Sequence, residues 1–193
     1  MKFFLLNTMG DANDTNLCFI GTNIPGMGIE DWRLLKGEPM AQFFPADAKA
    51  TMDDAHPGIK LASMIGNNQV FFIASSALRA LVEKHCKTGV EYLPFTLLDH
   101  RKRLASKDYC LVHPIGTLDC LDEAASQIQY SKKGKAVGYG EFILDAAKIK
   151  DAPQIFRMSR FTAKIILGEA LMNDIQAAGL TNVVAAPLRT SDS

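Results

Sequence analysis

The sequence predicts an α+β protein with mixed or antiparallel sheets and packed helices. The prediction rests on a strand, helix, strand pattern over residues 70–96 that returns over residues 163–189. In both segments a short apolar run is typical of a buried strand, and a small or capping residue after it (Ser75, Gly168) begins a stretch with helical period. We therefore expect two related strand-helix-strand units.

The two segments align without a gap, which makes chance a poor explanation for their likeness. The aligned pairs are Ala77-Leu78 with Ala170-Leu171, Val82 with Ile175, Thr88 with Thr181, Val90 with Val183, and Pro94 with Pro187. Leu78, Leu81 and Val82 share one helix face, and Leu171, Ile175 and Ala178 repeat it, so both helices should dock on a sheet. Gly179 is expected to end the second helix, and each proline places its strand at an edge or a bulge.

Other short strands surround these units. We expect them at residues 3–6, 17–20, 59–61, 109–112, 142–144 and 155–157, with the first two in a hairpin, a turn at 131–134, a hairpin over 134–140, and a frayed tail over 190–193. The chain divides at residue 105 into an N-terminal half (1–105) and a C-terminal half (106–193), each with one unit. The alternative is one compact domain.

The balanced composition disfavours several classes of partner. The 193 residues carry 21 basic and 21 acidic side chains, so no bulk field favours nucleic acid or an anionic membrane. No apolar run approaches the roughly 20 residues that span a bilayer. The first residues reach acidic side chains too early for a typical signal peptide, so we expect a cytoplasmic protein. The four cysteines lack the dense spacing of a disulfide scaffold and are expected to be reduced.

Three places carry candidate binding residues. The most basic run is His100, Arg101, Lys102 and Arg103, and a second basic pair, Lys132 and Lys133, lies in a predicted turn. Trp32 stands among charges, which is typical of a ring that Arg33 and Lys36 cover with their stems. Solvated loop charges and a half-buried tryptophan remain the alternative interpretation.

No set of residues predicts catalysis or a metal. Cys110 and His113 have ligand-like spacing, but positions i and i+3 of a strand face opposite sides, and no second pair completes a zinc site. His85 and Cys86 diverge around a helix and cannot act as a pair. Asp119, Asp122 and Glu123 have no His, Asn or further spaced acid in range that would complete a cation or acid-base site. They are typical of the acidic residues at a helix start. We therefore expect no catalytic activity, metal or cofactor.

Taken together, the chain resembles the immunity protein 11 family of bacterial polymorphic toxin systems. The likeness rests on DWRLLKGEP (31–39), HPGIKLASMIGN (56–67), VEYLPFTLLDHRKR (90–103), DYCLVHPIGTLDCLDEAAS (108–126) and APQIFRMSR (152–160), followed by the second unit. The family pattern often has a serine where this chain has Gly168, a departure that affects only a helix start.

The resemblance implies an antitoxin that binds and neutralises a cognate toxin encoded nearby. Such proteins recognise through their surface, so Trp32, residues 100–103 and residues 132–133 become candidate toxin contacts. An alternative is a small-molecule-binding regulator or enzyme that uses the basic run and Asp119 in a cleft between the units. A further option is a homodimer that pairs through the repeat surface.

Overall fold

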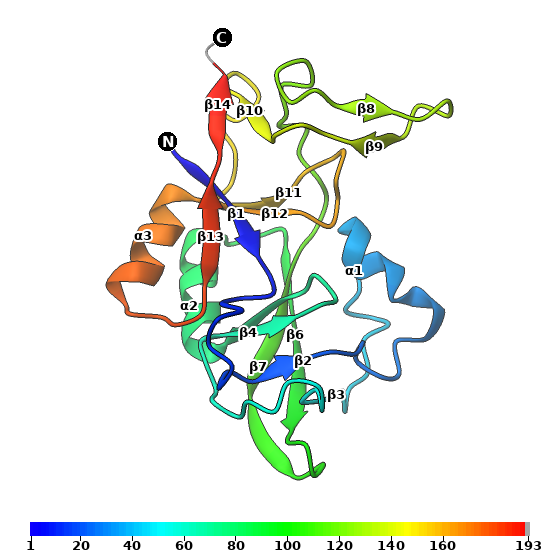
Figure 1. Cartoon of the computed structure of the whole chain (residues 1–193), viewed down its shortest axis with the longest axis vertical. Coiled ribbons are helices and arrows are strands. Elements are labelled where there is room, and N and C mark those ends of the chain that lie inside the picture. The colour runs from blue at the N-terminus through cyan, green and yellow to red at the C-terminus, as the bar shows by residue number, and fades with distance from the viewer. Residues whose placement is uncertain (192–193) are drawn as a thin grey trace.

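The computed structural model describes residues 1–191, in which sheets form most of the scaffold (Figure 1). Strands account for 34% and helices for 14% of the chain, which agrees with the expected α+β class at this coarse level. One sheet is antiparallel throughout and the largest sheet is mixed.

The antiparallel sheet has four strands in the order β11-β12-β1-β13. Its strands are β1 (Phe3–Asn7), β11 (Ile155–Arg157), β12 (Ile165–Gly168) and β13 (Val184–Pro187). The first strand of the chain therefore lies between two strands from its last 30 residues. Alternation is clear in β12, where Ile165 and Leu167 face one core cluster and Ile166 faces another.

The six-stranded sheet has the order β2-β4-β5-β7-β6-β3. Its strands are β2 (Phe19–Ile20), β3 (Lys49–Thr51), β4 (Met64–Asn67), β5 (Phe72–Ser75), β6 (Val90–Leu98) and β7 (Leu104–Pro114). β6 and β7 form a long antiparallel hairpin. β3 pairs with β6 only from Thr96 onward, and a register irregularity lies between Phe95 and Leu97. Pro94 thus lies on a part of β6 without a second neighbour, where its missing N–H costs no ladder bond.

Two helices, α2 (Ser76–His85) and α3 (Glu169–Ala177), contact each other and share a core with both sheets. Both lie on the same side of the molecule (Figure 1). Leu78 and Val82 of α2 and Leu171 and Ile175 of α3 are buried in this core, as the helical periodicity predicts. The residue 105/106 boundary falls inside β7, and the division into two halves stays a prediction.

The remaining elements are short. They are a 3-10 turn η1 (Gly28–Glu30), helix α1 (Trp32–Lys36), the hairpin of β8 (Gln129–Tyr130) and β9 (Ala136–Gly138), and the parallel pair β10 (Ile143–Asp145) and β14 (Arg189–Ser191).

Four local expectations are wrong. The strands at 3–6 and 17–20 form no hairpin, because β1 joins the four-stranded sheet and β2 pairs with β4. The strand before the first unit is Met64–Asn67, and residues 59–61 lie outside the named strands. Ala178 is exposed because α3 has already ended, and Gly179 follows with a left-handed φ of 63°. Thr190 and Ser191 belong to β14, while residues 192–193 lie outside the described part.

A buried polar joint connects the two sheets. Arg157 of β11 donates from Nε to the Pro114 carbonyl (3.1 Å), from Nη1 to the Thr162 carbonyl (2.8 Å) and from Nη2 to His113 Nδ1 (3.3 Å). His113 Nε2 lies 2.8 Å from the Glu38 carbonyl. Since a guanidinium only donates and a carbonyl only accepts, His113 is neutral with its proton on Nε2. Burial lowers the pKa of Arg157 to about 10, so it stays charged at neutral pH.

Candidate functional site

The predicted binding residues lie in three separate regions. His100, Arg101, Lys102 and Arg103 form the turn of the β6–β7 hairpin at one end of the long axis. Lys132 and Lys133 lie in the β8–β9 turn at the other end, and Trp32 begins α1 on the flank (Figure 1). The structure therefore does not bring the seven residues into one patch.

The turn of the β6–β7 hairpin is held by one carboxylate. Asp99 accepts from the backbone N–H groups of Arg101 (2.8 Å) and Arg103 (2.9 Å), and from the Arg103 guanidinium (2.7 Å). The backbone bonds from Arg103, followed by its side chain, lower the pKa of Asp99. Lys102 adopts a left-handed φ of 59°, which completes the reversal. The turn is thus ordered before any partner arrives.

Two cations of this turn are free to act on a partner. Arg101 and Lys102 are exposed and take part in none of the ion pairs within residues 1–191, whereas Arg103 is paired with Asp99. His100 is oriented differently, with Nδ1 3.6 Å from Asp54 Oδ1 and Nε2 buried without a hydrogen-bond partner among the described groups. The hairpin tip therefore presents guanidinium and ammonium groups above a rigid base.

Aliphatic side chains lie beside these cations. Ile59 (68% exposed), Leu61 (42%) and Leu104 (60%) are large apolar residues at the surface. Ile59 and Leu61 line an open hollow of about 500 Å³ together with Met52, Asp99, His100, Arg101, Arg103 and Ala105. We call Ile59, Leu61 and residues 99–105 the hairpin surface. It combines an apolar centre with a charged rim, the anatomy of a protein interface.

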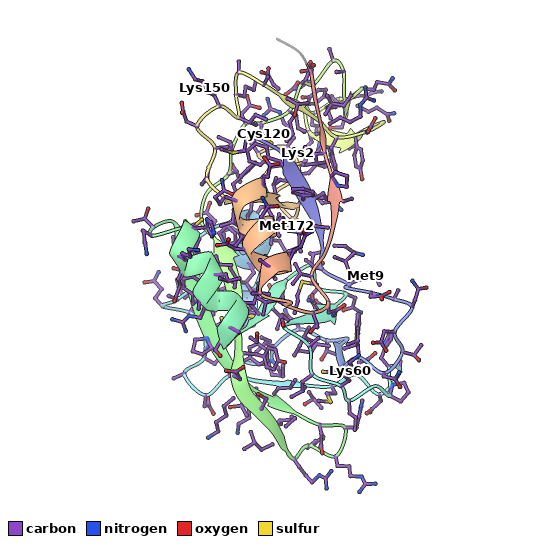
Figure 2. All side chains as sticks on the ribbon, turned by 90° about the vertical axis from the view of Figure 1, so that its left-hand side faces the viewer. Lys2, Met9, Lys60, Cys120, Lys150 and Met172 are labelled. Carbon is purple, nitrogen blue, oxygen red and sulfur yellow. The ribbon has the colours of Figure 1, made fainter. Side chains whose placement is uncertain are left out.

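Chain segments distant in sequence build this surface. Residues 59–61 precede β4, and Lys60 is held there by a backbone exchange with Asn16 and Cys18 and by its ion pair with Asp14 (2.9 Å). Lys60 lies in the lower half of the molecule with the hairpin (Figure 2). The sequence predicts a short strand over residues 59–61 and carries no signal that Ile59 and Leu61 lie at the surface.

In the second region, around α1, the arginine next to Trp32 is already paired within the chain. Trp32 is 46% exposed, and Ile29 and Leu35 are also at the surface. The Arg33 guanidinium carbon lies 5.0 Å from the Trp32 ring centroid, and Arg33 Nε lies 2.6 Å from Glu30 Oε2. Arg33 covers the Trp32 ring, as the sequence predicts, but the charge of Arg33 is already paired with Glu30.

The third region, the β8–β9 hairpin, has free cations but partly engaged aromatic rings. Lys132 and Lys133 are exposed and join no ion pair in residues 1–191. Tyr139 stacks on Phe142 with a centroid distance of 3.8 Å, and the Tyr130 hydroxyl donates to Glu123. The tyrosines therefore fasten this hairpin to the body.

The cleft expected between the units does not collect the residues assigned to it. A hollow of about 390 Å³ near the end of α2 is lined by His85, Cys86 and Thr117 among others. Asp119 instead pairs with Lys148 (3.2 Å), and its neighbour Cys120 lies in the upper half, far from the basic run (Figure 2). Residues 1–191 contain no cluster of three or more His, Cys, Asp or Glu side chains suited to a metal ion.

The thiols provide no reactive site. All four cysteines are free, and Cys18, Cys110 and Cys120 are buried. Burial raises the pKa of Cys18 and Cys120 to about 12 and that of Cys110 to about 11, which suppresses the nucleophilic thiolate. Among the described helices, none has the length and apolar character needed to cross a membrane.

An α+β scaffold with a rigid amphipathic hairpin is the form of a protein that works through its surface. The sequence model of an immunity protein family, Imm11, matches residues 31–189. The chain belongs to this family. The match spans α1, α2 and α3 and all three candidate regions. No curated protein matches the chain.

Proposed function

We propose that the protein is a cytoplasmic antitoxin that binds a cognate toxin, encoded by a neighbouring gene, and neutralises it without catalysis. Membership of the immunity protein family supports this proposal most strongly. The amphipathic hairpin surface supports it independently, because exposed aliphatic residues next to unpaired cations are typical of a binding site.

Neutralisation by occlusion requires tight binding. A nanomolar complex corresponds to about 12 kcal/mol and usually buries about 800 Å² on each partner. The protein exposes 10072 Å², so a standard footprint covers roughly 8% of it. Such a footprint cannot reach both ends of the long axis. The candidate contacts Trp32, residues 100–103 and residues 132–133 are therefore alternatives for one toxin interface.

The test is to express the neighbouring toxin gene in sensitive cells, with and without this chain. We expect survival only with the chain, and a one-to-one complex of nanomolar affinity when the purified proteins are mixed in a calorimeter. Protection without a complex would indicate an enzyme that modifies the toxin or its target. Absence of protection against the toxin would refute the antitoxin function.

The homodimer remains a separate proposal that the same samples test. Sedimentation of the free chain over a range of concentrations distinguishes a monomer from a self-associating subunit. An antitoxin that acts by occlusion is expected to sediment as a complex with its toxin whether or not it dimerises.

A further inference from the structure

We infer that the hairpin surface is the toxin-binding site, and that it accepts an acidic protein surface with an aliphatic centre. This inference rests on the proposed function and adds to it the location of the contact and the chemistry of the partner. The carrying observation is the juxtaposition of Ile59 and Leu61 with the unpaired cation Arg101 around one open hollow. The exposed residues Lys102 and Leu104 lie next to this lining in the same turn.

The hairpin surface differs from the other two candidate regions in how ready it is to bind. Asp99 fixes the turn through bonds to Arg101 and Arg103, so little conformational entropy is lost when a partner docks. At α1, Arg33 is held by Glu30 and by the Trp32 ring. In the β8–β9 hairpin, the exposed tyrosines pack on or bond to the body.

Charge complementarity determines the partner. Carboxylates facing Arg101 and Lys102 would gain favourable contacts, while aliphatic groups would fill the hollow beside Ile59 and Leu61. Two free cations can neutralise only a few of the closely spaced phosphates of a nucleic acid, because Arg103 is already paired with Asp99, whereas they can match isolated carboxylates. The exposed apolar side chains are aliphatic, so they provide no platform on which bases stack.

This chemistry also restricts the toxin. An enzyme that degrades nucleic acid binds its substrate in a basic cleft, and a basic hairpin would be repelled there. The hairpin surface therefore contacts the toxin outside such a cleft, or it contacts a toxin whose substrate is not a polyanion.

The experiment uses the full chain and the purified polypeptide encoded by the neighbouring toxin gene. The variant Arg101→Glu/Lys102→Glu reverses both free cations of the hairpin. The matched control, Lys132→Glu/Lys133→Glu, makes the same change in charge at the opposite end. Ile59→Ser tests the apolar lining of the hollow. Each variant is first unfolded in urea. Only variants whose midpoint agrees with that of the wild type are used, so that a change in affinity does not reflect a loss of folding.

We expect calorimetry at moderate salt to show at least a 100-fold loss of affinity for the hairpin reversal, about a tenfold loss for Ile59→Ser, and less than a threefold change for the control. Raising sodium chloride tenfold should weaken the wild-type complex about tenfold and the hairpin variant much less. These results together would support an acidic partner surface.

If the affinity for the toxin is unchanged by the hairpin reversal, or falls equally in the control, this inference is overturned. The antitoxin function would still stand. Absence of any complex would refute both. Binding of the free chain to a 20-base-pair DNA duplex or to vesicles with anionic lipid, lost in the hairpin variant, would assign the surface to a different class of partner and overturn the inference as well.

Discussion

The two larger sheets place four of their strands in the same order but are completed differently. In one, β5 and β6 flank β7 and β4 lies outside β5; in the other, β12 and β13 flank β1 and β11 lies outside β12. β7 follows β6 through the long hairpin, whereas β1 arrives from the start of the chain. Only the first arrangement leaves a protruding turn, and that turn carries the hairpin surface. The relatedness of the two units remains a prediction.

The starts of the two helices also differ. Ser75 Oγ accepts from the Leu78 N–H at 3.4 Å, a local cap. Gly168 has no side chain to offer, and Gln154 Oε1 accepts from the Leu171 N–H at 3.2 Å instead. A Cβ on Gly168 would lie 2.3 Å from that oxygen. Gly168 therefore makes room for a cap from another segment.

The largest expected effect tests the core that both larger sheets share. Val82→Asp and Ile175→Asp each place an unpaired carboxylate among buried side chains and should lower the free energy of unfolding by about 3–5 kcal/mol. The exposed controls Ala80→Asp and Asn173→Asp should change it by about 0.5 kcal/mol or less. Urea midpoints measure all four. A loss of stability in only one of the two core variants would show that the two sheets unfold separately.

The next effect tests the polar joint between the sheets. Burial lowers the pKa of His113, the Glu38 hydrogen bond opposes this, and the Arg157 charge adds to the lowering. As the pH falls through about 6.5, His113 therefore becomes protonated in the unfolded chain but stays neutral in the folded protein. Stability is full above that pH and falls as the pH drops toward the lower, folded pKa, by at most about 1.4 kcal/mol per pH unit.

His113→Gln removes this titration while an amide N–H can still donate to the Glu38 carbonyl. The variant should lose stability at neutral pH, but its unfolding free energy should fall less steeply between pH 7 and 5. His56→Gln, at an exposed histidine stacked on Phe19, is the control. Parallel pH profiles for wild type and His113→Gln would contradict the neutral state assigned to His113.

A smaller effect tests the two caps. Gln154→Ala and Ser75→Ala should each cost about 1 kcal/mol, since each leaves an N-terminal helix N–H unsatisfied. In a Gly168→Ser background, Gln154→Ala should cost almost nothing, because the new serine can cap the helix and displaces the glutamine. A thermodynamic cycle of thermal or urea unfolding gives the coupling. Equal costs of Gln154→Ala in both backgrounds would show that Gln154 is not the cap.

The smallest effect concerns the hairpin turn. Lys102 holds a left-handed conformation that costs an L-residue about 1 kcal/mol, so Lys102→Gly should raise stability by roughly 0.5 kcal/mol after the entropy of glycine is counted. Arg101→Gly, at a neighbour with ordinary φ, should lower stability by a few tenths of a kcal/mol. Denaturation curves of the two variants that shift in the same direction would contradict this backbone assignment.

The sequence by itself determined the features that depend on local periodicity. Alternation and helical spacing identified the buried Leu78 and Val82 of α2, the buried Leu171 and Ile175 of α3, and the position of β11. The glycine signal placed the left-handed Gly179 just after the end of α3. The spacing of apolar residues fixes which face of a helix or strand is buried, and it does so whatever the element packs against. The order of short motifs was also enough to identify the family, which the match over residues 31–189 confirms.

Only the tertiary structure decided which distant segments meet. The insertion of β1 between β12 and β13, the Arg157–His113 joint, and the cap from Gln154 join residues whose local sequence carries no signal of the other partner. The hairpin surface arises in the same way. The basic run is visible in the sequence. Ile59 and Leu61 come to lie beside it because the backbone of Lys60 is bonded to residues 16–18, and such packing is set by the whole fold.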